Sequence, residues 1–600
     1  MTKWTLFFLI LVLTLGFPTH MRSQELDGAA VFQQRCAMCH LDSKETRAPS
    51  QAILGQLSRS YIQRSLESGE MRSVGSQLTK EERAAVAKFL SAADNPESQT
   101  RAGYCSIASK PTMDDPGWTA WGVDLENTRF VPKTVSRLTR TEIPNLKLKW
   151  AFAFPGAYAT YGQPSVFGGR VYAGSEDGTV YSLDAKTGCI YWTFKAPATV
   201  KTAVVPGFGG RIVYFGDVGG NVYAANAATG KVVWKTRVDP HPTARITGSP
   251  VFFRGRLYVP VSSGEEGMAA DPKYACCTFR GNLVALDGRT GKQIWKTYTI
   301  PEVPKPTGRT NSAGTPLSGP SGAAVWSPPT IDAKKGEIYV ATGNSYSDPP
   351  VPYTDAVIAF RLSDGKMLWH HQLTPDDRWN LACVSPGRVN CPDGPGGDFD
   401  FGSPPILRKL PGGRRILIVG QKSGVVYGLN PDQKGKIVWE SRIGKGGPLG
   451  GIEWGGAANG AEVYFPLSDW DPDNPRAGGG LFALQAATGK RIWTAPPPRP
   501  ACLQQVGCSA AQSAPPTVIP GVVFSGSEDA HLRAYDARDG RVIWDFDAFR
   551  AFPTVNGMVA HGGSMNATGP AIVDGMLYVQ AGYTNNIAGN VLLAFSADGK

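Results

Sequence analysis

Long apolar runs are almost absent from this chain of 600 residues. One run lies near the start, from Trp4 to Phe17, with Lys3 before it and a short polar stretch after it. Because that run is too short to cross a bilayer comfortably, we interpret residues 1–23 as a secretory signal peptide, with an uncleaved anchor as the alternative. No later stretch could span a membrane. The mature chain is therefore expected to be soluble and exported to the periplasm, an oxidising compartment.

Runs of like charge are also missing. Lys and Arg number 61 against 50 Asp and Glu, so the net charge of +11 is modest for this length. We interpret it as surface charge, which would favour an acidic partner protein and gives no reason to expect nucleic acid. The signal segment also lacks an obvious lipidation cysteine, which disfavours a lipid-anchored protein.

Glycine and tryptophan, by contrast, recur in a ten-residue pattern. A strand leads into a turn that ends in glycine, and a tryptophan follows four residues later, as in the segment LDAKTGCIYW. The 71 glycines and 47 prolines suit many tight turns between short strands. Clear copies end at Trp192, Trp234, Trp295 and Trp369, and looser copies end at Trp439, Trp493 and Trp544.

These repeats predict a β-propeller, because each copy follows an apolar strand with its own turn and tandem four-stranded sheets form propeller blades. The last segment, Val591 to Lys600, begins the pattern and stops before its tryptophan, whereas residues 145–154 supply a strand and Trp150. We expect the two ends to share the eighth blade, which removes exposed sheet edges. An open solenoid or a seven-bladed ring is the alternative, since the tryptophan spacing varies.

The first chemical motif follows the signal segment. Cys36, Cys39 and His40 form a C-x-x-C-H sequence, in which two thiols bind haem covalently and the histidine ligates the iron. The residues before the motif are predicted to form a helix, and 78–90 a closing amphipathic helix with a Thr cap. A chance match or a redox-active cysteine pair is the alternative.

A cytochrome c fold needs a second axial ligand, and Met71 is the best candidate because it lies in a polar loop. Thioether ligation would raise the haem potential and suit an electron relay. The alternative is a packing methionine in the haem crevice. We therefore predict an all-α cytochrome c domain over 24–95, a polar linker over 96–117 and the all-β propeller over 118–600.

The chain has ten cysteines, of which the haem motif uses two. An adjacent pair closes a disulfide ring only with a distorted peptide, and such distortion tends to mark functional sites. A flat ring could support a planar cofactor, and free thiols are the alternative. Connectivity cannot be read from sequence, but the plausible pairs are Cys383 with Cys391, Cys502 with Cys508, Cys105 with Cys189, and Cys276 with Cys277.

The segment ACCTFRG from Ala275 to Gly281, the tryptophan repeats and the appended haem motif together resemble the quinoprotein alcohol dehydrogenases. That family implies an eight-bladed propeller holding pyrroloquinoline quinone (PQQ) and Ca²⁺. A cytochrome ahead of the propeller is similar to the polyvinyl-alcohol-oxidising members. The resemblance covers nearly the whole mature chain. It implies oxidation of secondary alcohol groups, a polymeric substrate, and electron flow from PQQ through haem c to a soluble cytochrome c or a similar acceptor.

Several site residues follow from this resemblance by position. Trp326 and Asn344 have the spacing of the family's tryptophan floor beneath the quinone and its calcium-ligating asparagine. Glu266, favoured over Glu265, matches the acidic ligand, and a hard dication needs such oxygen donors. In methanol-oxidising members the disulfide precedes this acidic motif, whereas here it follows.

Three further residues match cofactor contacts of the family. Arg280, just after the adjacent cysteines, would pair with a quinone carboxylate, for which a guanidinium is well shaped. Lys422 matches the cation near the reactive carbonyls, and Thr247 matches a hydroxyl that hydrogen-bonds the cofactor. Cys276 and Cys277 would stack on the quinone.

The catalytic base departs from the family pattern. Relatives carry a Trp-Asp pair, but here Asn380 follows Trp379, and an amide cannot act as a carboxylate base. We interpret the next segment as an insertion that moves the carboxylate downstream. Asp398 is then the first choice, Asp400 the second and Asp377 the third.

Two other functions remain open from sequence alone. One is a quinohaemoprotein that oxidises small alcohols. The other is a non-catalytic exported propeller that scaffolds other proteins, similar to outer-membrane assembly lipoproteins. The haem motif and the Trp326 and Asn344 pair both disfavour the scaffold.

Overall fold

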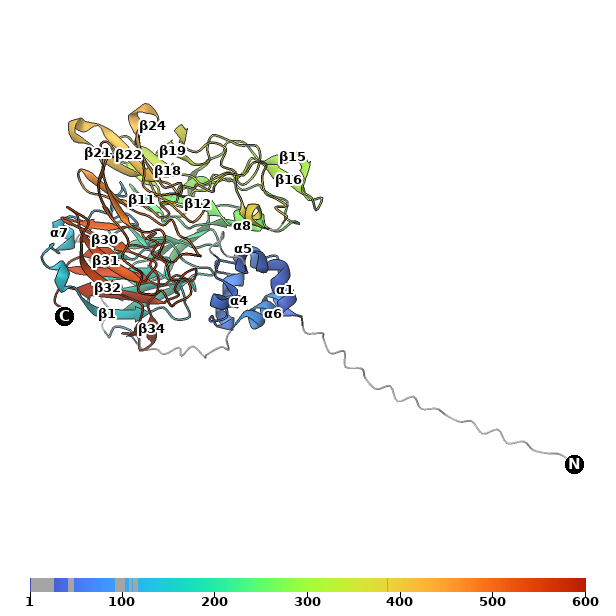
Figure 1. The fold of residues 1–600 in the computed structure, drawn as a ribbon, viewed down its shortest axis with the longest axis horizontal. Coiled ribbons are helices and arrows are strands. Elements are labelled where there is room, and N and C mark those ends of the chain that lie inside the picture. The colour runs from blue at the N-terminus through green and yellow to red at the C-terminus, as the bar shows by residue number, and fades with distance from the viewer. Residues whose placement is uncertain are drawn as a thin grey trace.

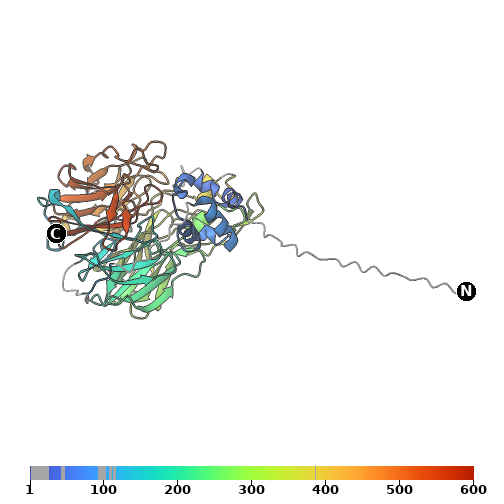
Figure 2. The same cartoon turned by 90° about the horizontal axis from the view of Figure 1, so that it is seen from below.

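The computed structural model contains a small helical domain and a β-propeller, and the helices lie against one side of the propeller (Figures 1 and 2). The predicted signal peptide lies outside the described residues except for Met1, and the predicted linker lies largely outside them, so these domain boundaries remain predictions. The structure describes residues 1, 26–41, 48–91, 103–106, 111, 117–385 and 387–599.

The helical domain forms because short capped helices bury one apolar face each. Thr79 and Glu82 form a capping box at the start of its longest helix. A Cβ at Gly28 would lie 2.2 Å from the Ala85 carbonyl, so glycine allows the first and last helices to approach closely. The helices are α1 (Gly28–Arg35), α2 (Ala37–His40), α3 (Gln51–Leu54), α4 (Arg59–Glu67), α5 (Arg72–Gly75) and α6 (Lys80–Leu90).

The propeller has eight antiparallel sheets within the described residues, which confirms the predicted blade number. Blade 1 contains β2 (Ser165–Phe167), β3 (Arg170–Gly174), β4 (Thr179–Asp184) and β5 (Ile190–Lys195), and blade 2 contains β6 (Val205–Gly207), β7 (Ile212–Gly216), β8 (Asn221–Asn226) and β9 (Val232–Arg237). Blade 3 contains β10 (Ala244–Arg245), β11 (Val251–Phe253), β12 (Arg256–Ser263), β13 (Asn282–Asp287) and β14 (Gln293–Tyr298). Blade 4 contains β17 (Thr330–Asp332), β18 (Glu337–Ala341), β19 (Ala356–Arg361) and β20 (Met367–Gln372).

The second half of the ring repeats the same plan. Blade 5 contains β21 (Ile406–Lys409), β22 (Arg415–Gly420), β23 (Val425–Asn430) and β24 (Lys436–Arg442), and blade 6 contains β25 (Ala457–Ala458), β26 (Glu462–Pro466), β27 (Leu481–Gln485) and β28 (Arg491–Ala495). Blade 7 contains β29 (Thr517–Ile519), β30 (Val522–Gly526), β31 (His531–Asp536) and β32 (Val542–Asp547). Blade 8 contains β35 (Ala571–Val573), β36 (Met576–Ala581) and β37 (Val591–Ser596) together with β1 (Lys147–Ala153).

Short helices and hairpins lie in the loops between the blades. Two hairpins stand apart from the blades, and the one formed by β15 and β16 projects on the side of the helical domain (Figure 1). These elements are β15 (Lys305–Thr310), β16 (Pro316–Gly319), β33 (Ala551–Pro553), β34 (Val559–His561), α7 (Lys133–Ser136), α8 (Glu265–Met268), and the 3₁₀ turns η1 (Ile143–Asn145), η2 (Leu381–Val384), η3 (Pro411–Gly413) and η4 (Pro431–Gln433).

The repeated tryptophan of one blade docks on the next blade. Trp192 Nε1 donates to the Ala227 carbonyl at 2.9 Å, and Trp234 Nε1 donates to the Gly288 carbonyl at 3.0 Å. Gly230 has a φ of +70°, and a Cβ there would lie 2.6 Å from the Trp192 ring. The glycine and the tryptophan of the pattern therefore serve neighbouring blades, because the indole lies flat against the glycine turn of the blade that follows.

The two ends of the propeller close the ring as predicted. Strand β1 pairs antiparallel with β37, and Trp150 lies opposite Ala594. Trp150 Nε1 donates to the Ala185 carbonyl of blade 1 at 3.2 Å, so this residue supplies the tryptophan that the last repeat lacks. Closure in this way leaves no edge strand unpaired at the junction.

Residues 117–131 run along the first strands of several blades. Backbone hydrogen bonds of 2.8–3.0 Å join this segment to β17, β21, β25 and β29, which belong to four consecutive blades. The segment therefore ties distant parts of the ring together, and it places Trp121 where those blades meet. The donors and acceptors are Ile331 to Leu125, Leu407 to Glu126, Ala458 to Thr128 and Val518 to Arg129.

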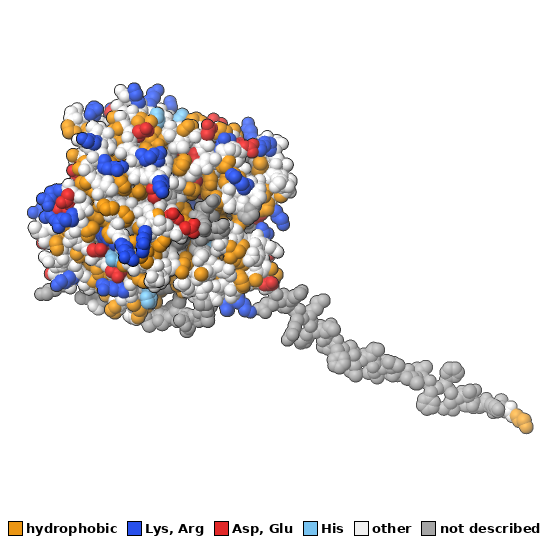
Figure 3. All heavy atoms as spheres, in the orientation of Figure 1, with side chains coloured by type: hydrophobic (Ala, Val, Ile, Leu, Met, Phe, Trp, Pro, Cys, Tyr) orange, Lys and Arg blue, Asp and Glu red, His pale blue; other side chains and the backbone are white. Residues whose placement is uncertain are grey.

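The surface carries mixed charge. On the face shown in Figure 3, basic side chains occur in small groups interspersed with acidic ones. Among the described residues, no helix is both long and apolar enough to cross a bilayer. The disulfides match the expected pairs, namely Cys105 with Cys189, Cys276 with Cys277, Cys383 with Cys391, and Cys502 with Cys508.

Candidate active site

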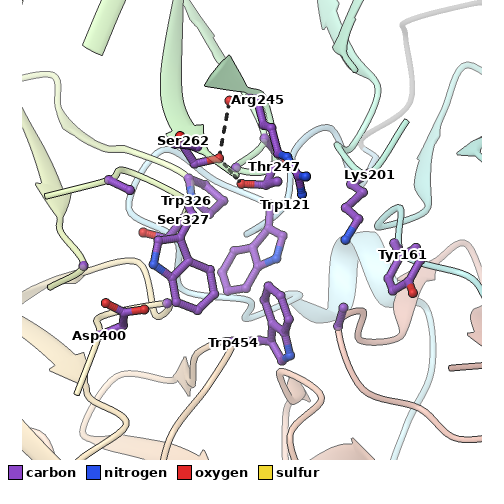
Figure 4. Close-up of a pocket in the computed structure, with 18 of the residues that line it drawn as sticks. Trp121, Tyr161, Lys201, Arg245, Thr247, Ser262, Trp326, Ser327, Asp400 and Trp454 are labelled. Atoms are coloured by element: carbon purple, nitrogen blue, oxygen red, sulfur yellow. Dashed lines mark hydrogen bonds between the residues drawn. The ribbon is translucent and has the colours of Figure 1, made fainter. Parts of the chain in front are cut away.

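A cavity of about 270 Å³ lies where loops of several blades meet the helical domain. We call it the central cavity. In Figure 4 three tryptophans surround the space, Arg245 and Thr247 lie on one side, and Asp400 lies beside Trp326. Its walls come from loops at strand ends, where a rigid scaffold commonly holds functional side chains. The lining residues used below are Trp121, Tyr161, Lys201, Arg245, Thr247, Glu266, Trp326, Asp400, Lys422 and Trp454.

Trp326 occupies the position predicted for a planar floor. Its ring lies edge-to-face with Trp454, with 5.3 Å between centroids and an interplanar angle of 88°. Gly402 packs against it so closely that a Cβ there would lie 2.1 Å from the indole. Lys422 Nζ lies 5.5 Å from the centre of the Trp326 ring. The ring is therefore held on several sides, which suits it to stack with a flat ligand.

The predicted acids and lysine form one buried cluster. Lys422 Nζ lies 3.2 Å from Asp398 Oδ2 and 3.1 Å from Asp400 Oδ2. Asp400 Oδ1 accepts a hydrogen bond of 2.7 Å from the backbone N–H of Asn344. Gly343 leaves room for this carboxylate, since a Cβ there would lie 2.5 Å from Asp400 Oδ1. Sequence reasoning thus brought together residues that are up to 78 positions apart.

Burial dominates the electrostatics of this cluster. Burial and the neighbouring Asp400 raise the pKa of Glu266. Burial also raises the pKa of Asp398, against the opposing effect of Lys422. Although burial alone would lower it, Asp398 and Asp400 hold the pKa of Lys422 above its ordinary value. The carboxylates outnumber the lysine, so a further cation would stabilise their charged forms.

The donor set fits a hard divalent cation. Asn344 Oδ1 and Asp398 Oδ1 are buried and have no hydrogen-bond partner, and the cavity-lining Glu266 is close enough to Asp400 for their charges to interact. Calcium takes such carboxylate and amide oxygens. Within the described part of the chain, no three His, Cys, Asp or Glu side chains are grouped to hold a metal by themselves. An ion here would therefore need Asn344 and a cofactor as additional ligands.

The two neighbouring glutamates have different surroundings. Glu265 is fully buried and accepts hydrogen bonds from the backbone N–H groups of Thr278 and Phe279, at 2.8 and 2.7 Å. Tyr274 also donates to it, at 2.8 Å. These contacts make Glu265 a structural residue, whereas Glu266 lines the cavity.

Asp377 is likewise engaged elsewhere. Its two carboxylate oxygens accept backbone N–H groups, from Asp398 at 3.1 Å and from Phe399 at 2.6 Å. It therefore holds the loop that carries the other two acids. This arrangement agrees with its place as the third choice for the base.

The structure does not place Arg280 at the central cavity. Its guanidinium donates to the carbonyls of Ile300 and Pro301, each at 3.1 Å, and stacks on Tyr298 at 3.8 Å from the ring centre. It does not line the cavity because its side chain is directed to a neighbouring loop. Arg245 lies there instead. The signal for Arg245 was its position two residues before Thr247, which faces the same cavity.

The adjacent disulfide also lies outside the cavity lining. Cys276 and Cys277 are buried and pack in one hydrophobic cluster with Ala324 and Tyr346, and these last two residues do face the cavity. Direct stacking on a quinone therefore stays a prediction without a contact to support it. Thr247 lines the central cavity, and its hydroxyl lies 2.7 Å from Ser262 Oγ.

Sequence reasoning missed Trp121 and Trp454. Trp121 is held by Arg129, whose guanidinium is 4.7 Å from its ring and which is completely buried. Trp454 Nε1 donates to Asn566 Oδ1 at 2.7 Å. Neither tryptophan belongs to the repeated pattern, and their position outside that pattern is the feature of the sequence that could have indicated a role in the cavity.

A second cavity, of about 400 Å³, surrounds the C-x-x-C-H motif, and we call it the haem cavity. Cys36, Cys39, His40 and Met71 all line it. His40 Nδ1 lies 2.7 Å from the Pro49 carbonyl, which leaves Nε2 for a metal. Burial lowers the pKa of His40 and so favours the neutral ligand form. The arrangement fits haem c with His40 and Met71 as axial ligands.

The two cavities share a wall. Glu70 of the helical domain and Lys201 of the propeller form an ion pair in this wall, 2.7 Å long. Arg245 Nη2 donates to the Glu70 carbonyl at 3.0 Å, which adds a second link between the domains. The residues that line both cavities are Glu70, Tyr161, Lys201, Arg245, Ser263 and Glu266.

Comparison with known proteins agrees with this geometry. The chain is 39% identical over 96% of its length to the polyvinylalcohol dehydrogenase of a Pseudomonas species, covering 94% of that protein. It is also 39% identical to the polyvinylalcohol dehydrogenase of Sphingopyxis sp. (strain 113P3), with the same two coverages. The chain belongs to the polyvinylalcohol dehydrogenase family.

Two family models match separate parts of the chain. The model described as outer membrane protein assembly factor BamB matches residues 106–347 and 477–600. The model described as cytochrome c oxidase, cbb3-type, subunit III matches residues 23–90. The first agrees with the propeller, and the second identifies the helical domain as a cytochrome c domain. A non-catalytic scaffold would not need that second domain.

Solved structures support the fold. The quinohaemoprotein alcohol dehydrogenase of Comamonas testosteroni superposes with a TM-score of 0.59 at 20% identity, over 81% of each chain. This member of the polyvinylalcohol dehydrogenase family is accordingly a PQQ-dependent dehydrogenase that also carries haem c. The fit of the two cavities agrees with these cofactors.

Proposed function

We propose that the chain oxidises the secondary hydroxyl groups of polyvinyl alcohol to ketones in the periplasm and transfers the electrons through haem c to an external cytochrome c. The full-length identity to two polyvinylalcohol dehydrogenases carries this proposal. The shared wall of the two cavities supports an internal route for the electrons.

The chain's residues divide into those that hold the cofactor and those that act on the alcohol. Trp326 and Thr247 would position the quinone, and Arg245 would replace Arg280 as the cation near it. Glu266 and Asn344 would hold Ca²⁺. PQQ supplies the hydride acceptor and Ca²⁺ supplies a Lewis acid.

Asp398 is the proposed base that takes the hydroxyl proton. Its Oδ1 is buried and unpartnered, which leaves this oxygen able to accept a proton. Both oxygens of Asp400 are already engaged, by the Asn344 N–H and by Lys422. Asp400 therefore holds Lys422 and the wall of the cavity in place.

Two isosteric substitutions separate these roles. Asp398→Asn should lower alcohol oxidation about 10²- to 10⁴-fold, the usual contribution of a general base, and retain stoichiometric PQQ. Asp400→Asn should weaken PQQ and Ca²⁺ binding together with activity. Near-normal turnover of Asp398→Asn would transfer the role of the base to Asp400.

The substrate is tested by the haem absorbance of the oxidised protein, loaded with PQQ and Ca²⁺, before and after addition of polyvinyl alcohol. We expect reduction of the haem that requires both PQQ and the polymer, and weaker reduction when Ca²⁺ is left out. Haem reduction by 2-propanol or ethanol but not by the polymer would make the chain a small-alcohol dehydrogenase.

A further inference from the structure

We propose that an open groove beside the acid cluster binds the segment of a polyhydroxylated polymer that flanks the hydroxyl being oxidised. This inference rests on the proposed function and extends it to the way in which the substrate is held. The groove has a volume of about 730 Å³ and is formed by residues of three loops, within 379–385 and 387–396, within 445–450 and within 467–479. It is separate from the central and haem cavities, with which it shares no lining residue.

The groove borders the active site at two points. The backbone carbonyl of Trp379, which lines the groove, accepts a hydrogen bond of 2.7 Å from Asn344 Nδ2. Gly447, also in its lining, donates its N–H to the Lys422 carbonyl at 3.1 Å. Residues that line the groove therefore hydrogen-bond directly to the predicted calcium ligand and to the lysine of the acid cluster.

A third contact leads to the proposed base. Gly396 lines the groove and packs on Asp377 so closely that a Cβ there would lie 2.1 Å from Asp377 Oδ1. The same carboxylate oxygen accepts the N–H of Asp398. Asp398 thus lies between the groove, which it meets through Asp377, and the central cavity, which it meets through Lys422 and Asp400.

Among the described residues, the lining of the groove contains no residue of the helical domain. The loop that begins with η2 separates the two sides, because Leu381 lines the haem cavity while Cys383 and Val384 line the groove. The disulfide between Cys383 and Cys391 braces this loop, and Ser385 Oγ lies 3.0 Å from Met38 Sδ of the cytochrome domain. The groove therefore runs beside the cytochrome domain, where a chain longer than the cavity has room to extend.

The lining suits an uncharged chain with alternating methylene and hydroxyl groups. Trp379 and Trp470 supply indole surface for the methylenes, and an indole also has a polar edge. Lys445, Arg388 and Asp471 mix both signs of charge, so the lining does not select a strongly charged polymer.

One aspartate holds the glycine-rich wall in shape. Asp469 accepts backbone N–H groups from Lys445 at 2.7 Å, Gly446 at 3.0 Å and Gly451 at 2.8 Å. The wall is thus preformed, and glycine leaves its backbone open to close approach by a ligand. A small alcohol would occupy only the reacting position and would leave a groove of this size unused.

Direct binding tests the groove without turnover. We would titrate the PQQ-free protein with short vinyl alcohol oligomers by calorimetry, using the wild type, Trp470→Ala and Val384→Asn. Phe549→Ala is the matched control because it removes an exposed aromatic side chain that lies outside the groove lining. We expect Trp470→Ala and Val384→Asn to weaken binding about tenfold, with the control equal to the wild type.

Kinetics of the loaded enzyme give the second readout. In Trp470→Ala the KM for the polymer should rise about tenfold relative to the KM for 2-propanol, and turnover of 2-propanol verifies that the variant has folded. Equal affinity of all four proteins for the oligomers, or an unchanged ratio of KM values, overturns the groove. Oligomer binding that depends on Trp470 without polymer oxidation would retain the groove and reject the proposed function. Polymer oxidation with a KM that is unchanged in Trp470→Ala would retain the proposed function and reject the groove.

Discussion

Glu70 and Lys201 join the cytochrome domain to the propeller through an ion pair of 2.7 Å in the wall between the two cavities. Lys201 Nζ also lies 4.0 Å from the centre of the Tyr161 ring. Both side chains are largely buried, so this pair is screened less than a surface pair. The contact holds the haem domain at a defined position over the proposed quinone site.

Lys201→Met should slow reduction of the haem by substrate roughly three- to tenfold, because Glu70 would be left without its partner at the domain contact. Oxidation of PQQ by an artificial acceptor that bypasses the haem should change less. Stopped-flow absorbance and a dye-linked assay measure the two steps. Lys195→Met is the control, since Lys195 pairs with Asp177 on the exposed side of blade 1. Equal effects of both variants would contradict a special role for Lys201.

Trp326→Ala should weaken PQQ binding roughly tenfold to a hundredfold, because the quinone would lose its aromatic floor. Gly402→Ala should have the same direction of effect, since the new Cβ would displace the indole. Quenching of tryptophan fluorescence by PQQ measures both affinities. Gly460→Ala serves as the control, because a Cβ there meets nothing within 4 Å. Unchanged affinity in the first two variants would remove Trp326 from the cofactor site.

Stability should depend on pH through Glu176. Burial raises its pKa to about 7, and it accepts hydrogen bonds from Tyr61 of the cytochrome domain and from the N–H groups of Tyr158 and Ala159. The Glu176 carboxyl binds its proton more tightly in the folded state than in the unfolded state. Its contribution to the free energy of unfolding is therefore complete below about pH 4.5 and is lost as the pH rises through 7. The loss is on the order of 3 kcal/mol.

Glu176→Gln should therefore flatten the decline in melting temperature of the holoenzyme between pH 5 and pH 8. The exposed acid substitution Glu440→Gln should leave the wild-type slope. A slope that persists in Glu176→Gln would assign the dependence to other groups.

Met71→Ala should lower the midpoint potential of the haem, because loss of a thioether ligand removes the stabilisation of the reduced iron. A spectroelectrochemical titration measures the potential, and added imidazole should then bind the open position. Met38→Leu is the control, since Met38 lies within the attachment motif and contacts Ser385. Identical potentials in Met71→Ala and the wild type would exclude Met71 as the axial ligand.

Local patterns predicted much of the molecule. The glycine and tryptophan repeat predicted the blades because both residues make the same contact at each junction, as Gly230 and Trp192 show. Trp326, Asn344 and Lys422 were predicted from the resemblance to the quinoprotein alcohol dehydrogenases, whose site motifs have matching positions in this chain. The side chain of Arg280 lies away from the cavity, since adjacency to a motif does not determine where a long side chain points.

The sequence by itself determined the blade number, the ring closure through Trp150 and the haem motif. Each depends on residues that are near one another in the chain or on a pattern that recurs, whereas the residues of the acid cluster were predicted from the family resemblance. Only the tertiary structure decided that Arg245 faces the cavity, that Trp121 and Trp454 complete its walls, and that Glu70 meets Lys201. These contacts join segments from different blades and from the cytochrome domain, which come within a few ångströms of each other only when the ring closes and the helical domain packs against it.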